Sequence, residues 1–294
     1  MRIATDWEDY ELIDACDGER LEQWKSVSLI RPDPQIIWRT GHKNPLWEEA
    51  NARYFRSDKG GGTWRVLHPH PESWTVGYKG LHFKISPTGF KHTGLFPEQA
   101  VNWDRFLDWI PKAGRPISVL NLFAYTGGAT LACLKAGASV CHVDASKGMV
   151  SWAKENAALS GLSEASVRWI VDDCEKFVAR EIRRGKRYDA IIMDPPSYGR
   201  GPSGEVWQLE DKIYDLVDLC SQVLSDNPLF VALSSYTTGL SPSVMEYLLG
   251  VTVGKTYDGH VSSDEIGLRV SETGLTLPCG STAFWTSSNL SKEE

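Results

Sequence analysis

Residues 117–128 read Ile-Ser-Val-Leu-Asn-Leu-Phe-Ala-Tyr-Thr-Gly-Gly, an apolar run that ends in a glycine-containing loop. A short apolar run before glycines predicts a buried strand, and the apolar spacing from Gly128 to Gly137 predicts a helix after it. Glycines here let the backbone approach a ligand beside the free N–H groups of the helix start. Taken alone, they fit an ordinary strand-to-helix turn equally well.

The same unit of strand, turn and helix repeats along the rest of the chain. Further strands are predicted at residues 139–144, 167–171, 188–193 and 229–234, and helices at 147–159, 175–184, 209–224 and 243–249. This alternation predicts parallel strands joined by right-handed crossovers, with ligand sites beyond the carboxyl ends of the strands. Apolar segments around 267–270 and 282–285 predict a closing antiparallel pair. The predicted fold class is α/β, with a doubly wound sheet.

The first 112 residues differ from the rest of the chain in composition and in pattern. Eight of the twelve Trp precede residue 112, and short alternating segments such as 75–86 are typical of strands bounded by turns. Residues 1–90 hold 12 Lys and Arg against 13 Asp and Glu, so this part is not a basic arm. We predict a small β-rich, Trp-rich domain at residues 1–112 and the α/β domain at 113–294. Tryptophan in such a region more often packs a small domain than stacks on a base.

Composition and charge narrow the classes of function. With 294 residues, 41% hydrophobic and 23% charged, the chain has a globular composition, and its formal charge of −7 excludes a broad basic surface for long nucleic acid. The basic run 183–187 fits the solvated end of a helix. The chain shows neither an apolar stretch of roughly 18 residues nor a signal-peptide layout, so we expect a cytoplasmic protein without membrane contact. The six Cys lack ligand spacing, which predicts reduced thiols and no metal.

Acidic residues follow two of the predicted strands. Asp144 closes the second strand, where a carboxylate can accept both hydroxyls of a ribose. Asp173, in the pair Asp172-Asp173, follows the third strand, where a carboxylate can accept from an adenine amine. Each also fits the N-cap of the next helix. Because no glycine follows Gly128 until Gly137, the G-x-G-x-x-G motif of a nicotinamide site is absent. The series of strand ends outlines an adenosine pocket.

The most specific motif is Asp194-Pro195-Pro196-Ser197-Tyr198, which directly follows the fourth strand. Two prolines fix the backbone, so one side chain and the neighbouring carbonyls are held where a planar substrate can be gripped. A turn without function rarely needs this sequence at a strand end. We therefore expect Asp194, Pro195, Pro196 and Tyr198 to be catalytic residues.

These motifs, in this order and spacing, resemble those of class I S-adenosylmethionine-dependent methyltransferases. Two further segments, FKHTGLFPEQ at 90–99 and LPCG at 277–280, make the chain similar to the bacterial group that includes the large-subunit ribosomal RNA cytosine-C5 methyltransferase. The resemblance spans about residues 75–285. It implies a Rossmann-like sheet of seven strands, the last one antiparallel, and S-adenosyl-L-methionine as cofactor.

The resemblance also implies site residues. The methionine end of the cofactor is expected near Tyr125 to Gly128, its ribose hydroxyls on Asp144, and its methyl group facing Asp194 to Tyr198. Phe96 and Gln99 are expected to close over it. The implied cofactor-binding residues are Phe96, Gln99, Asn121, Phe123, Ala124, Tyr125, Thr126, Gly127, Gly128, Asp144, Ala145, Asp173, Cys174 and Asp194.

The chemistry at the target atom stays open. A cytosine-C5 enzyme needs a thiolate that adds to the ring, but none of the six Cys lies at the Asp194 turn or in Leu233-Ser-Ser-Tyr-Thr-Thr after the fifth strand. The alternative is direct in-line transfer to a nitrogen or oxygen, in which the Pro195 carbonyl and the Asp194 carboxylate accept hydrogen bonds from an amine. Tyr198 is expected to stack on the substrate.

The leading hypothesis is an S-adenosylmethionine-dependent methyltransferase that methylates a base in RNA, with ribosomal RNA as its substrate. Two alternatives remain. One is methylation of a small molecule or a protein side chain, which the acidic charge and the missing Cys favour. The other is a protein that binds the cofactor without turnover. If RNA is the substrate, a charge of −7 favours a small target bound at a local site over binding along a long stretch of phosphate backbone.

Overall fold

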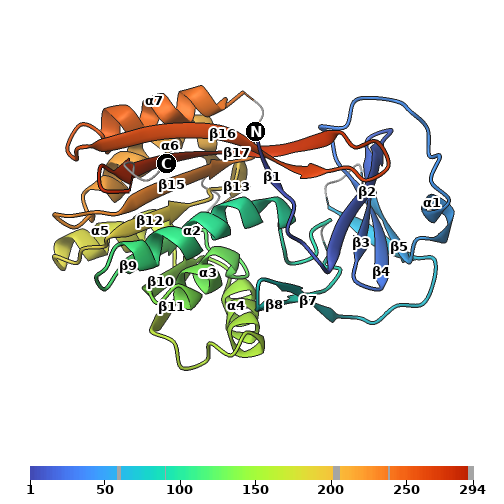
Figure 1. Cartoon of the computed structure of the whole chain (residues 1–294), viewed down its shortest axis with the longest axis horizontal. Coiled ribbons are helices and arrows are strands. Elements are labelled where there is room, and N and C mark those ends of the chain that lie inside the picture. The colour runs from blue at the N-terminus through green and yellow to red at the C-terminus, as the bar shows by residue number, and fades with distance from the viewer. Residues whose placement is uncertain (58–60, 90, 201–205, 238, 291–294) are drawn as a thin grey trace. The chain divides into compact units, whose positions relative to one another are not determined.

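The computed structural model describes the chain except for residues 58–60, 90, 201–205, 238 and 291–294. The chain divides into two compact units, whose elements are labelled in Figure 1. Unit 1 comprises Met1–Val101 and Ile266–Cys279, and unit 2 comprises Asn102–Glu265 and Gly280–Glu294. Unit 1 therefore includes a segment that is distant in sequence from the rest of it. The division into domains at 1–112 and 113–294 stays a prediction.

A mostly parallel sheet runs through unit 2. Its strands are β9 (Ser118–Leu122), β10 (Ser139–Asp144), β11 (Val167–Val171), β12 (Ala190–Met193), β15 (Phe230–Ser235), β16 (Gly259–Arg269) and β17 (Thr276–Ser287). The order is β11-β10-β9-β12-β15-β17-β16, and β1 (Arg2–Ala4) pairs with the part of β16 that belongs to unit 1. Neighbours from β11 to β15 are parallel, and β17 is antiparallel to β15. The predicted fold class is confirmed.

Helices cover both faces of this sheet, so its central strands β9, β12 and β15 are buried along almost their whole length. On one face, α5 (Cys174–Arg183), α6 (Leu209–Ser221) and α7 (Pro242–Thr252) bury Phe177, Leu216 and Leu249 in one apolar cluster with Val231 of β15. Phe230, the residue before Val231, points to the opposite face because side chains alternate along a strand. There the ring of Phe106 stacks on Phe230, with centroids 5.1 Å apart.

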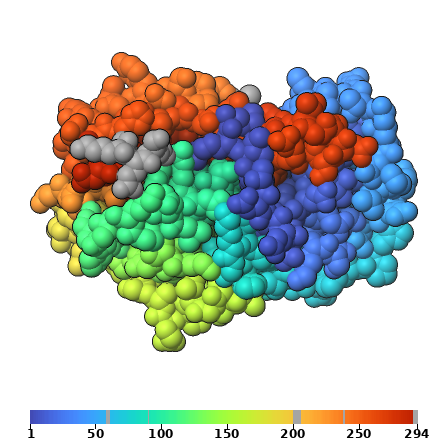
Figure 2. All heavy atoms as spheres, viewed as in Figure 1, coloured from blue at the N-terminus to red at the C-terminus, as the bar shows by residue number. Residues whose placement is uncertain are grey.

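That opposite face carries α2 (Ala100–Lys112), α3 (Gly128–Lys135) and α4 (Lys147–Leu159). In the space-filling view these green segments form a continuous surface (Figure 2). Helix α2 was not predicted, because its residues were assigned to a β-rich region. None of the helices in the described residues is long and apolar enough to cross a membrane.

Unit 1 is β-rich, as predicted. It has a five-stranded sheet of β2 (Tyr10–Cys16), β3 (Glu19–Trp24), β4 (Val27–Pro32), β5 (Ala52–Arg56) and β6 (Gly62–Val66), a hairpin of β7 (Trp74–Tyr78) and β8 (Leu81–Ile85), and two short helices, α1 (Leu46–Glu49) and η1 (Pro97–Gln99). Among the eight tryptophans before residue 112, Trp24, Trp47, Trp103 and Trp109 are buried. Burial of Trp24 and Trp47 fits packing of the small domain, whereas Trp103 and Trp109 lie on α2 (Ala100–Lys112) in unit 2. Trp38 is 38% exposed.

A buried ion pair lies inside unit 1. The Glu22 carboxylate accepts two hydrogen bonds from the Arg31 guanidinium, at 2.5 and 2.7 Å, and one from the Tyr10 hydroxyl at 2.9 Å. Burial alone raises the pKa of Glu22, but Arg31 and Arg20 outweigh it and hold the pKa below its usual value. The charge is tolerated here because it is paired and hydrogen-bonded.

Candidate functional site

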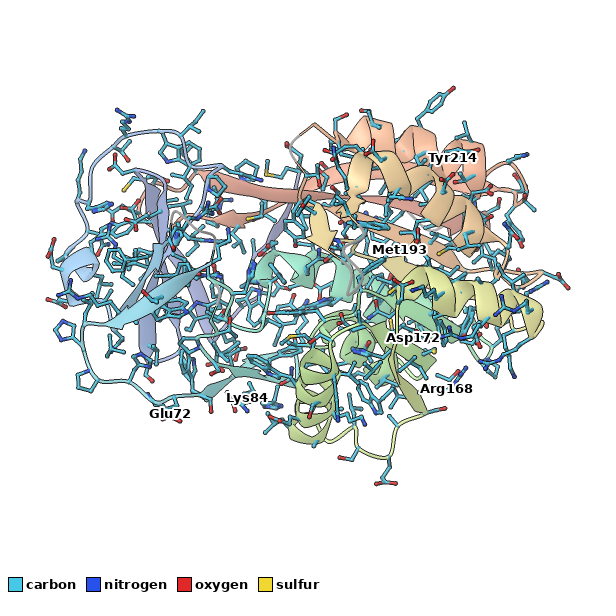
Figure 3. The ribbon with its side chains drawn as sticks, turned by 180° about the vertical axis from the view of Figure 1, so that it is seen from behind. Glu72, Lys84, Arg168, Asp172, Met193 and Tyr214 are labelled. Carbon is cyan, nitrogen blue, oxygen red and sulfur yellow. The ribbon has the colours of Figure 1, made fainter. Side chains whose placement is uncertain are left out.

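The strand order reverses between β9 and β12, whose carboxyl ends lie side by side. Leu122 pairs with Met193, which Figure 3 labels at the end of β12. The chain leaves β9 through residues 123–127 and leaves β12 through residues 194–197. In doubly wound folds, ligands bind outside the carboxyl ends of strands where the order reverses. The structure therefore brings the predicted residues of both loops to one edge of the sheet.

The loop after β9 has an unusual backbone. Phe123 and Tyr125 have φ of 55° and 51°, and Gly127 has φ of 89°. Left-handed backbone at non-glycine residues costs about 1–3 kcal/mol each, so the surroundings must hold it. The N–H of Tyr125 donates to Asp144 at 2.9 Å, and the Asn156 amide donates to the Thr126 carbonyl at 2.9 Å. Strain of this kind clusters at functional sites.

Both predicted glycines are required by local geometry. A Cβ on Gly128 would lie 2.6 Å from the Trp103 ring, and one on Gly127 would lie 3.1 Å from the Ala153 Cβ. Gly127 also has a positive φ, which a side chain would strain. The turn and its packing thus account for glycine at both positions, and the loop comes close to α2 and α4.

Asp144 lies at the carboxyl end of β10 and is half-buried. One carboxylate oxygen accepts from the Tyr125 N–H at 2.9 Å and the other from the Ser146 N–H at 2.8 Å. The N-cap of α4 is Ser146, which accepts from Met149. Since each carboxylate oxygen has two lone pairs, Asp144 keeps acceptor capacity after holding the loop.

Asp173 is exposed and is the N-cap of α5, accepting from the Lys176 N–H at 2.9 Å. The N-cap interpretation left open by the sequence therefore describes this residue. Next to it, the buried Cys174 accepts from the Phe123 N–H at 3.3 Å, which ties α5 to the loop after β9. The basic run 183–187 lies at the other end of α5, whose last residue is Arg183, so it is a helix end as predicted.

The remaining predicted residues of this loop region differ in exposure. Asn121 is 3% exposed, and its amide donates to Thr130 at 2.9 Å within the fold. Ala124 is buried and Ala145 is exposed. Phe96 and Gln99 lie in unit 1, where the Gln99 N–H donates to the Phe96 carbonyl at 3.0 Å.

The Asp194–Ser197 turn leads into a small hairpin of β13 (Tyr198–Arg200) and β14 (Val206–Gln208). Pro195 is buried, whereas Tyr198 is 54% exposed. Trp207 and Thr237 contact this turn, and neither was among the site residues predicted from the sequence. The Trp207 indole N–H donates to the Pro196 carbonyl at 2.6 Å, and the Thr237 hydroxyl donates to the Ser197 hydroxyl at 2.6 Å.

All six cysteines are buried and unpaired. Burial raises the pKa of Cys16 and Cys174 to about 12 and that of Cys141 to about 11. It also raises the pKa of Cys133, Cys220 and Cys279. Each thiol is therefore protonated at neutral pH, and none is prepared as a nucleophile.

Among the described residues, unit 1 contains a cluster of three side chains of the types that bind metal ions. The donor atoms of Cys16, Asp17 and His42 lie within 4.8 Å of one another, but burial keeps the Cys16 thiol protonated and it lies 3.5 Å from the Gly41 carbonyl. The absence of a metal stays a prediction.

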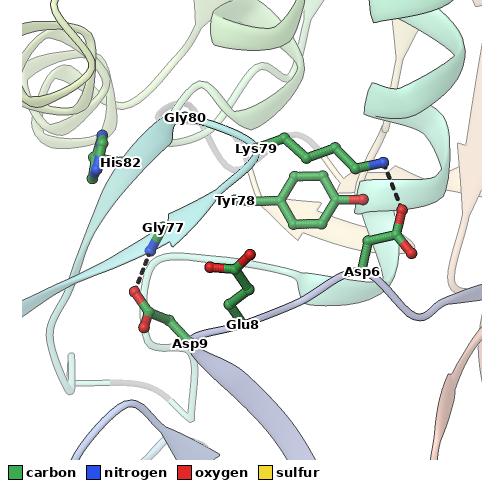
Figure 4. A pocket seen from close by; sticks show the side chains of 8 residues that line it. All are labelled: Asp6, Glu8, Asp9, Gly77, Tyr78, Lys79, Gly80 and His82. Carbon is green, nitrogen blue, oxygen red and sulfur yellow. Dashed lines mark hydrogen bonds and ion pairs between the residues drawn. The ribbon is translucent and has the colours of Figure 1, made fainter.

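A pocket of about 230 Å³ is lined by Asp6, Glu8, Asp9, Gly77, Tyr78, Lys79, Gly80 and His82 (Figure 4). Its charged groups bind one another: Lys79 lies 2.7 Å from Asp6, and the Gly77 N–H donates to Asp9 at 2.8 Å. These bonds already use polar groups that a ligand would need, and the pocket contains none of the predicted site residues.

Comparison with known proteins bears on this arrangement. A sequence model described as S-adenosylmethionine-dependent methyltransferase matches residues 38–218, which is more than half of the chain. The chain belongs to this family. A crystal structure of the SAM-dependent methyltransferase from Agrobacterium tumefaciens is 39% identical, with a TM-score of 0.89, over 97% of this chain and 92% of the other.

Two further proteins are less similar to the chain or match a shorter part of it. A ribosomal RNA large subunit methyltransferase K/L from Shewanella frigidimarina is 35% identical over 150 residues, which is 50% of this chain and 20% of that protein. The chain thus spans about a fifth of the length of the curated relatives it matches. The structure of SMU.776, complexed with SAH, has 17% identity and a TM-score of 0.75 over 96% of this chain and 76% of the other, which shows a shared fold.

Proposed function

We propose that this methyltransferase transfers a methyl group from S-adenosylmethionine to a base of RNA, with its site at the carboxyl ends of β9, β10 and β12. The observation that carries the proposal is the strained loop after β9, held by Asp144, beside the Asp-Pro-Pro turn after β12. The relatives named as ribosomal RNA methyltransferases support RNA as the substrate class. That substrate class fits a cytoplasmic location.

The chain's donor set fits the cofactor. Asp144 has one free acceptor position on each oxygen, which suits two ribose hydroxyls. The start of α3 offers backbone N–H groups beside residues 125–128. We assign cofactor binding to the predicted set, Phe96, Gln99, Asn121, Phe123, Ala124, Tyr125, Thr126, Gly127, Gly128, Asp144, Ala145, Asp173, Cys174 and Asp194. Of these, the Asn121, Asp173 and Cys174 side chains also have structural bonds.

S-adenosylmethionine supplies a methyl group that is already activated on a sulfonium. The chain then needs to orient the acceptor atom and remove its proton. The Pro195 carbonyl makes no hydrogen bond within the described part of the chain, so it can accept from an amine together with the Asp194 carboxylate. Tyr198 is exposed enough to stack on a base, and the rigid Pro195-Pro196 pair fixes the turn.

The state of the thiols favours transfer to nitrogen or oxygen over carbon 5 of a pyrimidine. That reaction at carbon needs a thiolate nucleophile, and burial keeps all six thiols of this chain protonated. We therefore propose an amino or ring nitrogen of the base as the acceptor.

Two measurements test this function. Calorimetry with S-adenosyl-L-homocysteine (SAH) is expected to show binding. Asp144→Ala is expected to weaken this binding by at least about tenfold, because the two charge-assisted hydrogen bonds from the ribose hydroxyls to Asp144 are lost. The control is Asp218→Asn, an exposed position on α6, with unchanged binding. Absence of SAH binding to the parent protein would contradict every hypothesis of methyltransferase function.

The substrate is tested by transfer of tritium from labelled S-adenosylmethionine into fractions from cells that lack the protein. We expect label in ribosomal RNA, and nuclease digestion is expected to release it as an N-methylated nucleoside. Label in protein or in small metabolites instead would favour the alternative substrates. SAH binding without label in any fraction would favour a binding protein without turnover.

A further inference from the structure

The hairpin that follows the Asp194–Ser197 turn folds one aromatic side chain back onto that turn. Trp207 on β14 pairs with Gly199 on β13, and its indole N–H donates to the Pro196 carbonyl at 2.6 Å. A Cβ on Gly199 would lie 3.7 Å from the Trp207 Cβ, so the two strands are closely apposed. The indole thus reaches back over its own hairpin to the second proline of the motif.

The Trp207 side chain also contacts the loop after the neighbouring strand, β9. Its ring centroid lies 5.8 Å from that of Phe123, at an interplanar angle of 45°. Phe123 is the first residue of the strained loop, with φ of 55°, and its N–H is held by Cys174. Trp207 therefore bridges the loop after β9 and the turn after β12, which lie on either side of the point where the strand order reverses.

The hydrogen bonds that anchor the Asp194–Ser197 turn do not involve the Pro195 carbonyl. Trp207 occupies the Pro196 carbonyl, and the Leu209 N–H donates to the Ser197 carbonyl at 3.1 Å. Thr237, which follows β15, holds the Ser197 hydroxyl from another side. The Pro195 carbonyl receives no hydrogen bond from the described residues. The anchoring bonds thus leave the first proline's carbonyl available to a substrate and fix its direction.

We propose that Trp207 is a positioning residue for methyl transfer: it fixes the Pro195 carbonyl and the Asp194 side chain relative to the loop after β9. This inference rests on the proposed function for the assignment of the turn to the substrate. Trp207 acts through the turn and does not itself bind cofactor or substrate. Its ring is half-buried at the edge of the apolar cluster beneath the sheet, so its packing and its hydrogen bond are separable by substitution.

Trp207→Phe keeps an aromatic ring against Phe123 and removes the indole donor. We expect kcat for methyl transfer to fall about three- to tenfold, the effect of one hydrogen bond, with the SAH dissociation constant within about twofold of the parent value. The control is Trp169→Phe, a half-buried tryptophan on β11 whose ring contacts His142. It is expected to change neither quantity.

A readout that needs no substrate separates this inference from the proposed function. In hydrogen exchange on the SAH-loaded protein, Trp207→Phe is expected to speed exchange of the amides of residues 197–199 and to leave those of β9 and β10 unchanged. Thr237→Val, which removes another anchor of the same turn, is expected to act in the same direction. It also provides the test if Trp207→Phe does not fold.

Unchanged exchange in both variants overturns the inference, as does faster exchange in the turn with unchanged kcat. A parallel loss of kcat, SAH affinity and thermal stability in Trp207→Phe reduces Trp207 to a packing residue and also overturns it. If the parent protein labels no RNA, the proposed substrate fails, while the exchange experiment still decides whether Trp207 holds the turn.

Discussion

Trp103 packs directly against the backbone of Gly128 at the start of α3. An added Cβ would lie 2.6 Å from Cζ2 of that ring, and the ring belongs to a buried residue with little room to move. Close-packed interiors accommodate such overpacking by shifts of side chains or backbone. One missing side chain therefore sets how closely α2 approaches the loop after β9.

Gly128→Ala is expected to lower the free energy of unfolding by about 1–3 kcal/mol, because the ring or the helix start has to move. Urea unfolding measures the change. Gly148→Ala is the matched control, since it also lies in the first turn of a helix and its Cβ would meet no atom closer than 3.8 Å. Helix propensity alone would stabilise both variants, so an equal loss in both would point to a general backbone effect instead of the Trp103 contact.

Glu181 links three elements of unit 2. Its carboxylate accepts from the Tyr188 hydroxyl at 2.6 Å, from Arg168 of β11 at 3.3 Å and from Arg184 at 3.1 Å. Burial by itself raises the pKa of Glu181, but the bonds from Tyr188, Arg184 and Arg168 outweigh it, so the pKa lies below its usual value. The ionised form thus joins α5, β11 and the segment that leads into β12.

Glu181→Gln is expected to cost about 1–3 kcal/mol of stability at pH 7, mostly through the buried Tyr188 bond, because the arginines are half exposed. A lowered native pKa means that this contribution is full above the unfolded pKa of about 4.3 and is lost as the pH falls through the native value. The difference between parent and variant in urea unfolding is therefore expected to shrink from pH 7 to pH 3. Glu164→Gln, at an exposed position, is the control, and a pH-independent difference would contradict the argument.

Elements with long apolar runs were predictable, and elements defined by distant partners were not. The strands at 139–144 and 167–171 were predicted with the bounds that the structure shows, because valine-rich runs flanked by serine and aspartate are typical of strands. Helix α2 was not predicted, although Trp103, Phe106 and Ile110 have helical spacing. Its aromatic residues resemble the Trp-rich composition of the strands before it, so it was assigned to the same β-rich region.

The same contrast holds for the candidate site. Asp144 was predicted because a rule ties strand ends to ligands, and the structure shows that its carboxylate holds the loop after β9. Trp207 was missed because its partner, the Pro196 carbonyl, lies 11 positions away across a hairpin of three-residue strands. Such short strands carry no periodic pattern from which pairing can be derived.

On the scale of the whole molecule, unit 1 is completed by residues 266–279. Ala4 pairs with Leu268, and the N–H groups of Ser271 and Glu272 donate to Leu12 and Ile13 at 3.0 and 2.9 Å. Leu268 is 1% exposed. The returning segment therefore contributes both backbone pairing and core to a unit whose other residues precede residue 102.

Leu268→Ala is expected to destabilise unit 1 by about 2–5 kcal/mol, the usual cost of truncating a buried leucine. In hydrogen exchange on the full chain, the amides of β1 and β2 are expected to exchange faster, while those of β9 and β12 keep their rates. Leu275→Ala, on the same segment but 70% exposed, is the control. Uniform acceleration over both units would show that they unfold as one.

This arrangement also sets an order in time when the chain is synthesised. The residues from 102 to 265 leave the ribosome before the partner of β1 does, a delay of roughly 10 to 30 s at about 5–20 residues per second. The strands made first are thus among the last to be completed. During that interval the edge that Leu268 later covers stays open, and a chaperone or a neighbouring nascent chain can reach it.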